Sequence, residues 1–285
     1  MKQTLYILFI ATLFYACTEP IDIDVDDAYN RIVVEGQISN DTMAHLIKIT
    51  RSADFFDGLA PEKISGANVY IKWNSDSVRL NEDSAGYYYT PSTFYAIENT
   101  IYELVIKNVD VDKDGKLEVY NAFDRMTNAI DIDFIKLERK IQVRGDSVEF
   151  VEVQMFAQEP PERNFYLFKT NINGKSVRDS LLEWNPSNDE FFNGNYTNGV
   201  AVQQLFSGDS TEVVKNNDIV TLELIQISQS YYNYILSAYF ESFGSFPLFS
   251  GPPANIVGNI SNGGVGYFSA VAVSRSSTIF NEETP

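Results

Sequence analysis

Arg31-Ile-Val-Val-Glu-Gly-Gln-Ile (residues 31–38) and His45-Leu-Ile-Lys-Ile-Thr (residues 45–50) are the two stretches that decide the fold. In the second stretch, isoleucines alternate with Leu, Lys and Thr, which is the period of a β-strand. Further short runs of β-branched and aromatic residues follow, each bounded by Asn, Asp, Ser or Gly. Short strands at this spacing predict a mostly β fold that begins with an Ig-like β-sandwich over residues 31–126.

The remaining chain, residues 127–285, predicts a second β-rich domain carrying one or two short helices. Asn173-Gly174 between two strand-like runs is a strong hairpin signal. Near the C-terminus, Gly263-Gly264 precedes an apolar run that is typical of a buried strand.

One helix is expected from about Gln229 to Ser242, with Ser228 as its N-cap. Apolar residues recur along it at the spacing of one helix face, which favours packing against the core over a cofactor site. These residues are Tyr231, Ile235, Ala238 and Tyr239.

The N-terminus has the layout of an export signal. A lysine is followed by an apolar run that ends near Tyr15, too short to span a bilayer, and then by Ala16 and Cys17. A small residue before a cysteine predicts a lipoprotein signal peptide over residues 1–16 and lipidation of Cys17. The alternative is an ordinary signal peptide cut after Ala16. Cys17 is the only cysteine in 285 residues, so no disulfide competes for it.

Residues 17–30 are expected to form the lipid anchor and an acidic tether. The whole chain has a net charge of -18, which argues against nucleic-acid binding because phosphates would be repelled. The chain therefore reads as an exported protein whose partner is a membrane, reached through the N-terminal lipid.

The segment from Asp110 to Gly115 resembles the start of a calcium-binding loop, with further carboxylates at Asp112 and Asp114. Position twelve of such a loop should be Glu, but it is Asn121, and the flanks read as strands rather than helices. Asp-Gly between strands is itself a hairpin signal. The sequence favours a plain turn, and no metal site or cofactor is expected.

Residues that could carry catalysis are scarce. His45 is the only histidine and reads as an exposed strand residue, and no Gly-x-Ser-x-Gly elbow occurs. Acidic residues are abundant, so no carboxylate pair is singled out as a glycosidase pair. The sequence predicts a protein that is not an enzyme and has no catalytic residues.

An aromatic, Asn- and Gly-rich loop from Asp189 to Gly199 is the one contact surface that the sequence suggests. Exposed aromatic side chains mark interaction sites. Phe191, Phe192 and Tyr196 are therefore the expected contacts for a ligand or partner.

Several stretches carry a family resemblance. Ile64-Ser-Gly-Ala-Asn-Val-Tyr-Ile, Ser84-Ala-Gly-Tyr-Tyr-Tyr-Thr and Thr100-Ile-Tyr-Glu-Leu-Val-Ile are similar to the carboxypeptidase-regulatory-like Ig fold, a non-catalytic module. With Cys17 and the C-terminal Gly264-Val-Gly-Tyr-Phe-Ser-Ala, the chain resembles DUF4249, a family of Bacteroidetes outer-membrane lipoproteins of unknown function. The resemblance covers nearly the whole mature chain.

The resemblance implies a location and a partner. Members of the family are often encoded beside TonB-dependent outer-membrane transporters, which implies an accessory or binding role at such a transporter. The expected location is the outer membrane, more on the cell surface than on the periplasmic face. The alternative function is a cell-surface adhesin or glycan-binding module, because aromatic residues can stack on sugar rings.

Overall fold

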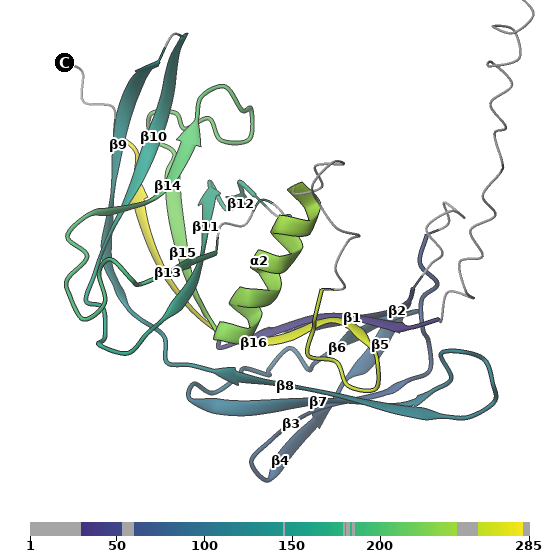
Figure 1. The fold of residues 1–285 in the computed structure, drawn as a ribbon. Helices are drawn as coiled ribbons and strands as arrows, with labels where there is room; N and C mark the ends of the chain where they lie inside the picture. The colour runs from purple at the N-terminus through teal and green to yellow at the C-terminus, as the bar shows by residue number, and fades with distance from the viewer. Residues whose placement is uncertain are drawn as a thin grey trace, which may run out of the picture.

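The computed structural model describes residues 30–52, 60–144, 146–178, 180, 183, 186–243 and 256–281. The signal peptide, Cys17 and the tether up to residue 29 lie outside these described residues. The described chain is mostly β, with three sheets and one α-helix, which confirms the predicted fold class (Figure 1).

The first half contains eight strands: β1 (Ile32–Ser39), β2 (Leu46–Arg51), β3 (Asn68–Trp73), β4 (Asp76–Arg79), β5 (Asn81–Ser84), β6 (Tyr87–Tyr89), β7 (Thr100–Val109) and β8 (Glu118–Met126). β1, β2, β6 and β5 belong to the nine-stranded sheet, whereas β4, β3, β7 and β8 form a separate four-stranded sheet. Fully buried residues of both sheets, such as Ile49 of β2 and Ile71 of β3, pack in one hydrophobic core. The first half is therefore a sandwich of two sheets, as its alternating strands predict.

The second half contains the remaining elements: β9 (Ile132–Arg144), β10 (Asp146–Ala157), β11 (Phe165–Ile172), β12 (Lys175–Ser176), β13 (Pro186–Asn188), β14 (Val200–Phe206), β15 (Ile219–Ile227), α2 (Gln229–Phe243) and β16 (Val265–Ile279). β14, β10 and β9 form a three-stranded sheet, and β12, β11, β15 and β16 continue the nine-stranded sheet. Buried residues such as Val153 of β10 and Leu222 of β15 fill a second core between the two sheets.

Strand β16 joins the two halves. Its first residues pair in parallel with β1, with Gly266 opposite Val34, and its last residues pair antiparallel with β15. Phe268 of β16 packs in the core of the first half, whereas its neighbour Tyr267 packs beneath α2. Both faces of β16 are buried from Gly266 to Val273, and this part of the strand is a nearly continuous apolar run, whereas its last six residues alternate and are partly exposed. The boundary expected at residues 126 and 127 remains a prediction about independent folding, since β16 belongs to both halves.

Helix α2 starts and packs as its sequence predicts. The Tyr231 backbone N–H donates to Ser228 Oγ at 3.2 Å, which is an N-cap bond. Tyr231, Ile235 and Ala238 are buried, and the first two pack against β11, β15 and β16. Tyr239 differs from the expectation: it is 40% exposed, because the buried stripe ends one position earlier.

Two predicted hairpins are confirmed. β7 and β8 pair antiparallel across the Asp110–Gly115 segment, and β11 and β12 pair across Asn173-Gly174. Asn173 and Gly174 have φ values of 52° and 78°, the left-handed conformations that a tight hairpin turn requires. In the part of the chain that is described, no helix combines the length and apolar character needed to cross a bilayer.

Candidate functional site

A polar cleft of about 650 Å³ lies where the segment joining β8 to β9 meets the segment joining β10 to β11. The volume falls within the range of small-molecule sites, roughly 300–1,000 Å³. Polar and charged side chains dominate the lining; among them are Asn99, Arg125, Asp131, Glu162, Arg163 and Gln226. The fold thus brings together residues that are far apart in sequence.

Asn164 and Gln226 are buried polar residues of the lining, with exposed fractions of 8% and 3%. Gln226 Nε2 donates to Asn164 Oδ1 at 2.5 Å, and the Asn164 backbone N–H donates to Asp189 Oδ2 at 2.8 Å. Asn164 Nδ2 in turn donates to the Glu162 carbonyl at 2.6 Å. These bonds fix both amides before any ligand arrives, which is the preorganisation that binding sites use.

Two lining residues carry polar atoms that the described protein does not satisfy. Gln226 Oε1 and Thr127 Oγ1 are buried and have no hydrogen-bond partner. A buried polar group without a partner costs about 1–3 kcal/mol. Such groups are rare in folded proteins, and their presence at a cleft makes this cleft a candidate binding site.

Glu159 lies close to this cleft, in the segment that forms one of its walls. Its side chain is only 1% exposed, and the Tyr166 hydroxyl donates to Glu159 Oε1. Burial raises the pKa of Glu159 to about 7; the bond from Tyr166 lowers it and the nearby Asp189 carboxylate raises it further. The carboxyl therefore changes charge near neutral pH.

Replacing Glu159 by glutamine is expected to remove a pH-dependent loss of stability. The folded pKa exceeds the ordinary 4.5, so between pH 4.5 and about 7 the folded chain holds a proton that the unfolded chain has released. The free energy of unfolding of the wild type should therefore fall as pH rises through this window. At pH 8 we expect the free energy of unfolding of Glu159→Gln to exceed that of the wild type by about 2 kcal/mol. This is less than the full pKa difference implies, because the surroundings of the buried carboxylate relax. At pH 4.5 the two proteins should be equally stable.

Chemical denaturation at several pH values measures this difference, and comparison with wild type cancels all groups other than Glu159. Glu162→Gln is the matched control, because Glu162 is an exposed carboxylate in the same segment. Its stability profile should run parallel to that of the wild type. A Glu159→Gln profile that also runs parallel would contradict the role assigned to burial.

The aromatic loop borders the same cleft. Phe191 is 94% exposed and Tyr196 is 42% exposed, whereas Phe192 is half-buried with its ring 6.5 Å from that of Tyr166. Tyr196 forms an isolated β-bridge with Gln158, a residue of the cleft lining, and desolvation, together with the Asp133 side chain of the same lining, raises the pKa of the Tyr196 hydroxyl. The structure therefore places Tyr196 at the cleft and leaves Phe191 free of packing, while Phe192 helps to hold the loop.

The loop is also fastened to the cleft wall through its backbone. The Gly194 N–H donates to the Pro160 carbonyl at 3.1 Å, and the Glu159 N–H donates to the Asn195 carbonyl at 3.1 Å. The charged and amide residues that line the cleft were not singled out by the sequence. The one local signal is Pro160-Pro161, since a proline pair breaks a strand pattern and indicates an irregular segment.

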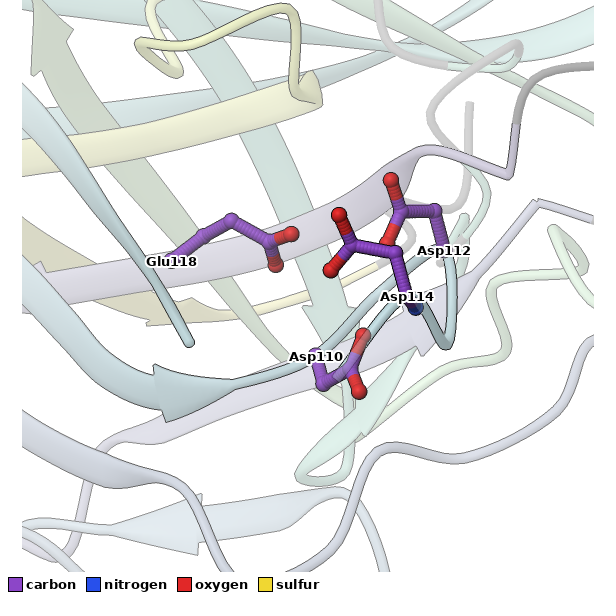
Figure 2. A group of neighbouring side chains, drawn as sticks. All are labelled: Asp110, Asp112, Asp114 and Glu118. Atoms are coloured by element: carbon purple, nitrogen blue, oxygen red, sulfur yellow. The ribbon is translucent and has the colours of Figure 1, made fainter. Parts of the chain in front are cut away.

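The acidic loop between β7 and β8 brings four carboxylates together (Figure 2). One oxygen from each of Asp110, Asp112, Asp114 and Glu118 lies within 4.8 Å of the others. The calcium-loop pattern in the sequence pointed to Asn121 at position twelve; the structure instead adds Glu118, the first residue of β8. The flanks are strands, as predicted.

The turn itself uses several of these oxygens. The Gly115 N–H donates to Asp110 Oδ2 at 3.0 Å, and Lys116 donates to Asp114 through its backbone and its Nζ, both at 2.7 Å. Asp110 Oδ1 is the buried oxygen that lacks a partner. These bonds account for the shape of the hairpin, so the loop fits the plain turn that Asp-Gly predicts.

The expectation that His45 is an exposed strand residue is wrong. It lies just before β2 and is 5% exposed, with its ring 5.7 Å from that of Phe94. Nε2 lies 3.1 Å from the Asp41 carbonyl, and burial lowers the pKa of His45. The alternating pattern of the following strand gave no sign of the loop residue Phe94 that covers it.

The structure defines a mostly β protein in which two sheet-against-sheet cores share the nine-stranded sheet and a polar cleft lies between the halves. The family model for DUF4249, a domain of unknown function, matches residues 18–277. The chain belongs to this family, which confirms the family resemblance seen in its sequence. No curated protein matches the chain.

Proposed function

We propose that the protein is a non-catalytic lipoprotein of the outer membrane that faces the cell surface and serves as a binding or accessory subunit of a TonB-dependent transporter. The observation that carries this proposal is Cys17, the only cysteine of the chain, at the end of a segment with the layout of an export signal. The family match begins at residue 18, so the region shared by the family follows Cys17 directly.

The cleft supports a binding role. It has the volume of a small-molecule site and a lining whose buried amides are held in fixed orientations. No cluster of His and Cys residues that could hold a metal occurs within the described ranges. A binding subunit needs only such a recognition surface, together with an anchor beside its partner.

Co-purification tests the accessory role. The full chain, tagged at its C-terminus, is extracted from membranes of its own cells in mild detergent, and bound proteins are identified by mass spectrometry. A TonB-dependent transporter should be enriched relative to the same tag on an unrelated lipoprotein. Recovery of the tagged chain alone, with no transporter, would contradict the proposed accessory role.

A cell-surface glycan-binding protein is the second candidate. The observation that favours it is Tyr196, an exposed aromatic side chain at the rim of a cleft lined by amides and charged groups. A glycan array probed with the full chain tests this candidate. Absence of binding to every glycan on the array would contradict it.

A further inference from the structure

Two arginines line the cleft without any carboxylate partner. The chain has 39 acidic residues against 21 Lys and Arg residues, and cations such as Arg51, Arg178 and Arg275 are paired with carboxylates. Among the described residues, neither Arg125 nor Arg163 makes an ion pair, although both belong to the cleft lining. Neither guanidinium is therefore in direct contact with a carboxylate of the described chain.

Both guanidinium groups are nevertheless positioned by neutral partners. Arg125 Nη2 donates to Asn99 Oδ1 at 2.6 Å. Arg163 lies with its guanidinium carbon 5.2 Å from the centre of the Phe165 ring, and Phe165 is a buried residue of β11. An amide and a ring face orient a guanidinium without competing for its charge, and most of its N–H groups stay free to donate.

The other lining residues limit the charge and chemistry of a ligand that could bind these arginines. Asp131, Asp133 and Glu162 are acidic residues of the same cleft, so a ligand with several negative charges would be repelled. No aromatic side chain of the described chain lines the cleft interior, so recognition there rests on charge and hydrogen bonds rather than on stacking. A single carboxylate on a ligand that also donates hydrogen bonds satisfies both kinds of lining residue.

We infer that the cleft binds a polar ligand through one carboxylate, received by Arg125 and Arg163, while hydroxyl or amino groups of the ligand donate to the acidic residues. This inference rests on the binding role proposed above and names its ligand class. Guanidinium and carboxylate groups match in geometry and form charge-assisted hydrogen bonds, the strongest kind in proteins. Sugar acids and short peptides with a single free carboxylate share this chemistry.

Calorimetric titration of the detergent-solubilised full chain at low ionic strength tests the inference. The probes are sodium glucuronate and the dipeptide Gly-Gly, each with one carboxylate, and glucose is the neutral counterpart of the first. At least one carboxylated probe should bind, and glucose should bind at least about tenfold more weakly. Which of the two carboxylated probes binds distinguishes a sugar acid from a peptide.

Variants connect binding to the two arginines. Arg125→Gln and Arg163→Gln should each weaken binding of the carboxylated probe at least about tenfold, because each removes a charged donor. Arg79→Gln is the matched control: Arg79 is exposed and donates to Asn68 Oδ1 at 2.9 Å, as Arg125 does to Asn99, but it lies outside the cleft. That variant should bind like wild type.

Three results would overturn the inference: no binding of either carboxylated probe, equal binding of glucose, or undiminished binding by both cleft variants. None of these results touches the anchor or the transporter complex, which co-purification measures separately. A chain that co-purifies with a transporter but binds no carboxylate would therefore refute only the ligand class.

Discussion

Substitution of Gly266 by alanine is expected to destabilise the protein by about 4 kcal/mol, which for a chain of this size lowers the Tm by roughly 10 °C. Gly266 has a φ of +95°, a conformation that L side chains rarely adopt. A Cβ built on it would lie 2.1 Å from the Val34 carbonyl oxygen, well inside van der Waals contact. The backbone that it would push away is β1, its parallel partner.

The effect should be large because β16 serves two cores at once. A shift of β16 away from β1 would disturb Phe268 in the core of the first half and Tyr267 beneath α2. Gly258 adds to the crowding, since its own Cβ would lie 1.8 Å from the Gly266 carbonyl oxygen. Three segments of backbone therefore meet at this position, and none can move alone.

Thermal unfolding followed by circular dichroism measures the loss. Gly208→Ala is the matched control, because a Cβ there meets nothing within 4 Å and the backbone needs no left-handed conformation. That variant should unfold within a degree or two of wild type. Equal Tm values for Gly266→Ala and wild type would show that the β1–β16 contact is not under steric constraint.

The sequence predicts the local elements of this fold well, because their signals are local. Alternation marks the strands of the first half, Asn173-Gly174 marks a tight turn, and Ser228 marks the start of α2. Each signal depends on residues only a few positions apart. The same holds for the first part of β16, whose apolar run predicts that both of its faces are covered.

Pairing between distant strands could not be predicted in this way. Val34 and Gly266 are opposite each other in β1 and β16 but more than 200 residues apart in sequence. The sequence of a strand does not predict which other strand pairs with it, because alternation determines only which residues face the core. The joining of both halves by one strand is therefore a finding of the structure.

The cleft could not be predicted either, because its lining residues come from segments that are far apart in sequence. Arg125, Arg163 and Gln226 come from three separate segments and form no motif. In a chain with many charged residues, an arginine that lacks an acidic partner looks like any other until its neighbours are known. The aromatic loop was visible because Phe191 and Tyr196 lie in one short segment of unusual composition.

Replacement of Cys17 by alanine or serine is expected to abolish lipidation and release the protein from the membrane. The proposed lipid would be attached to the thiol of this residue, and the chain has no second cysteine that could substitute. Two or more acyl chains are enough for stable anchoring, whereas the net charge of -18 gives the unlipidated chain no attraction to anionic headgroups. Loss of the thiol should therefore be an all-or-none change.

Incorporation of radiolabelled palmitate and fractionation of washed membranes measure the two consequences. Thr18→Ala is the matched control, because it alters the neighbouring residue and leaves the thiol and Ala16 in place. It should be labelled and membrane-bound like wild type. Label in the Cys17→Ala protein would overturn the assignment, whereas a wild-type chain without label would favour an ordinary signal peptide cut after Ala16. Since β1 starts fifteen residues after Cys17, a lipid there would keep the start of the β-rich body within about 50 Å of the membrane surface, the reach of an extended chain of this length, which is compatible with the proposed role beside a transporter.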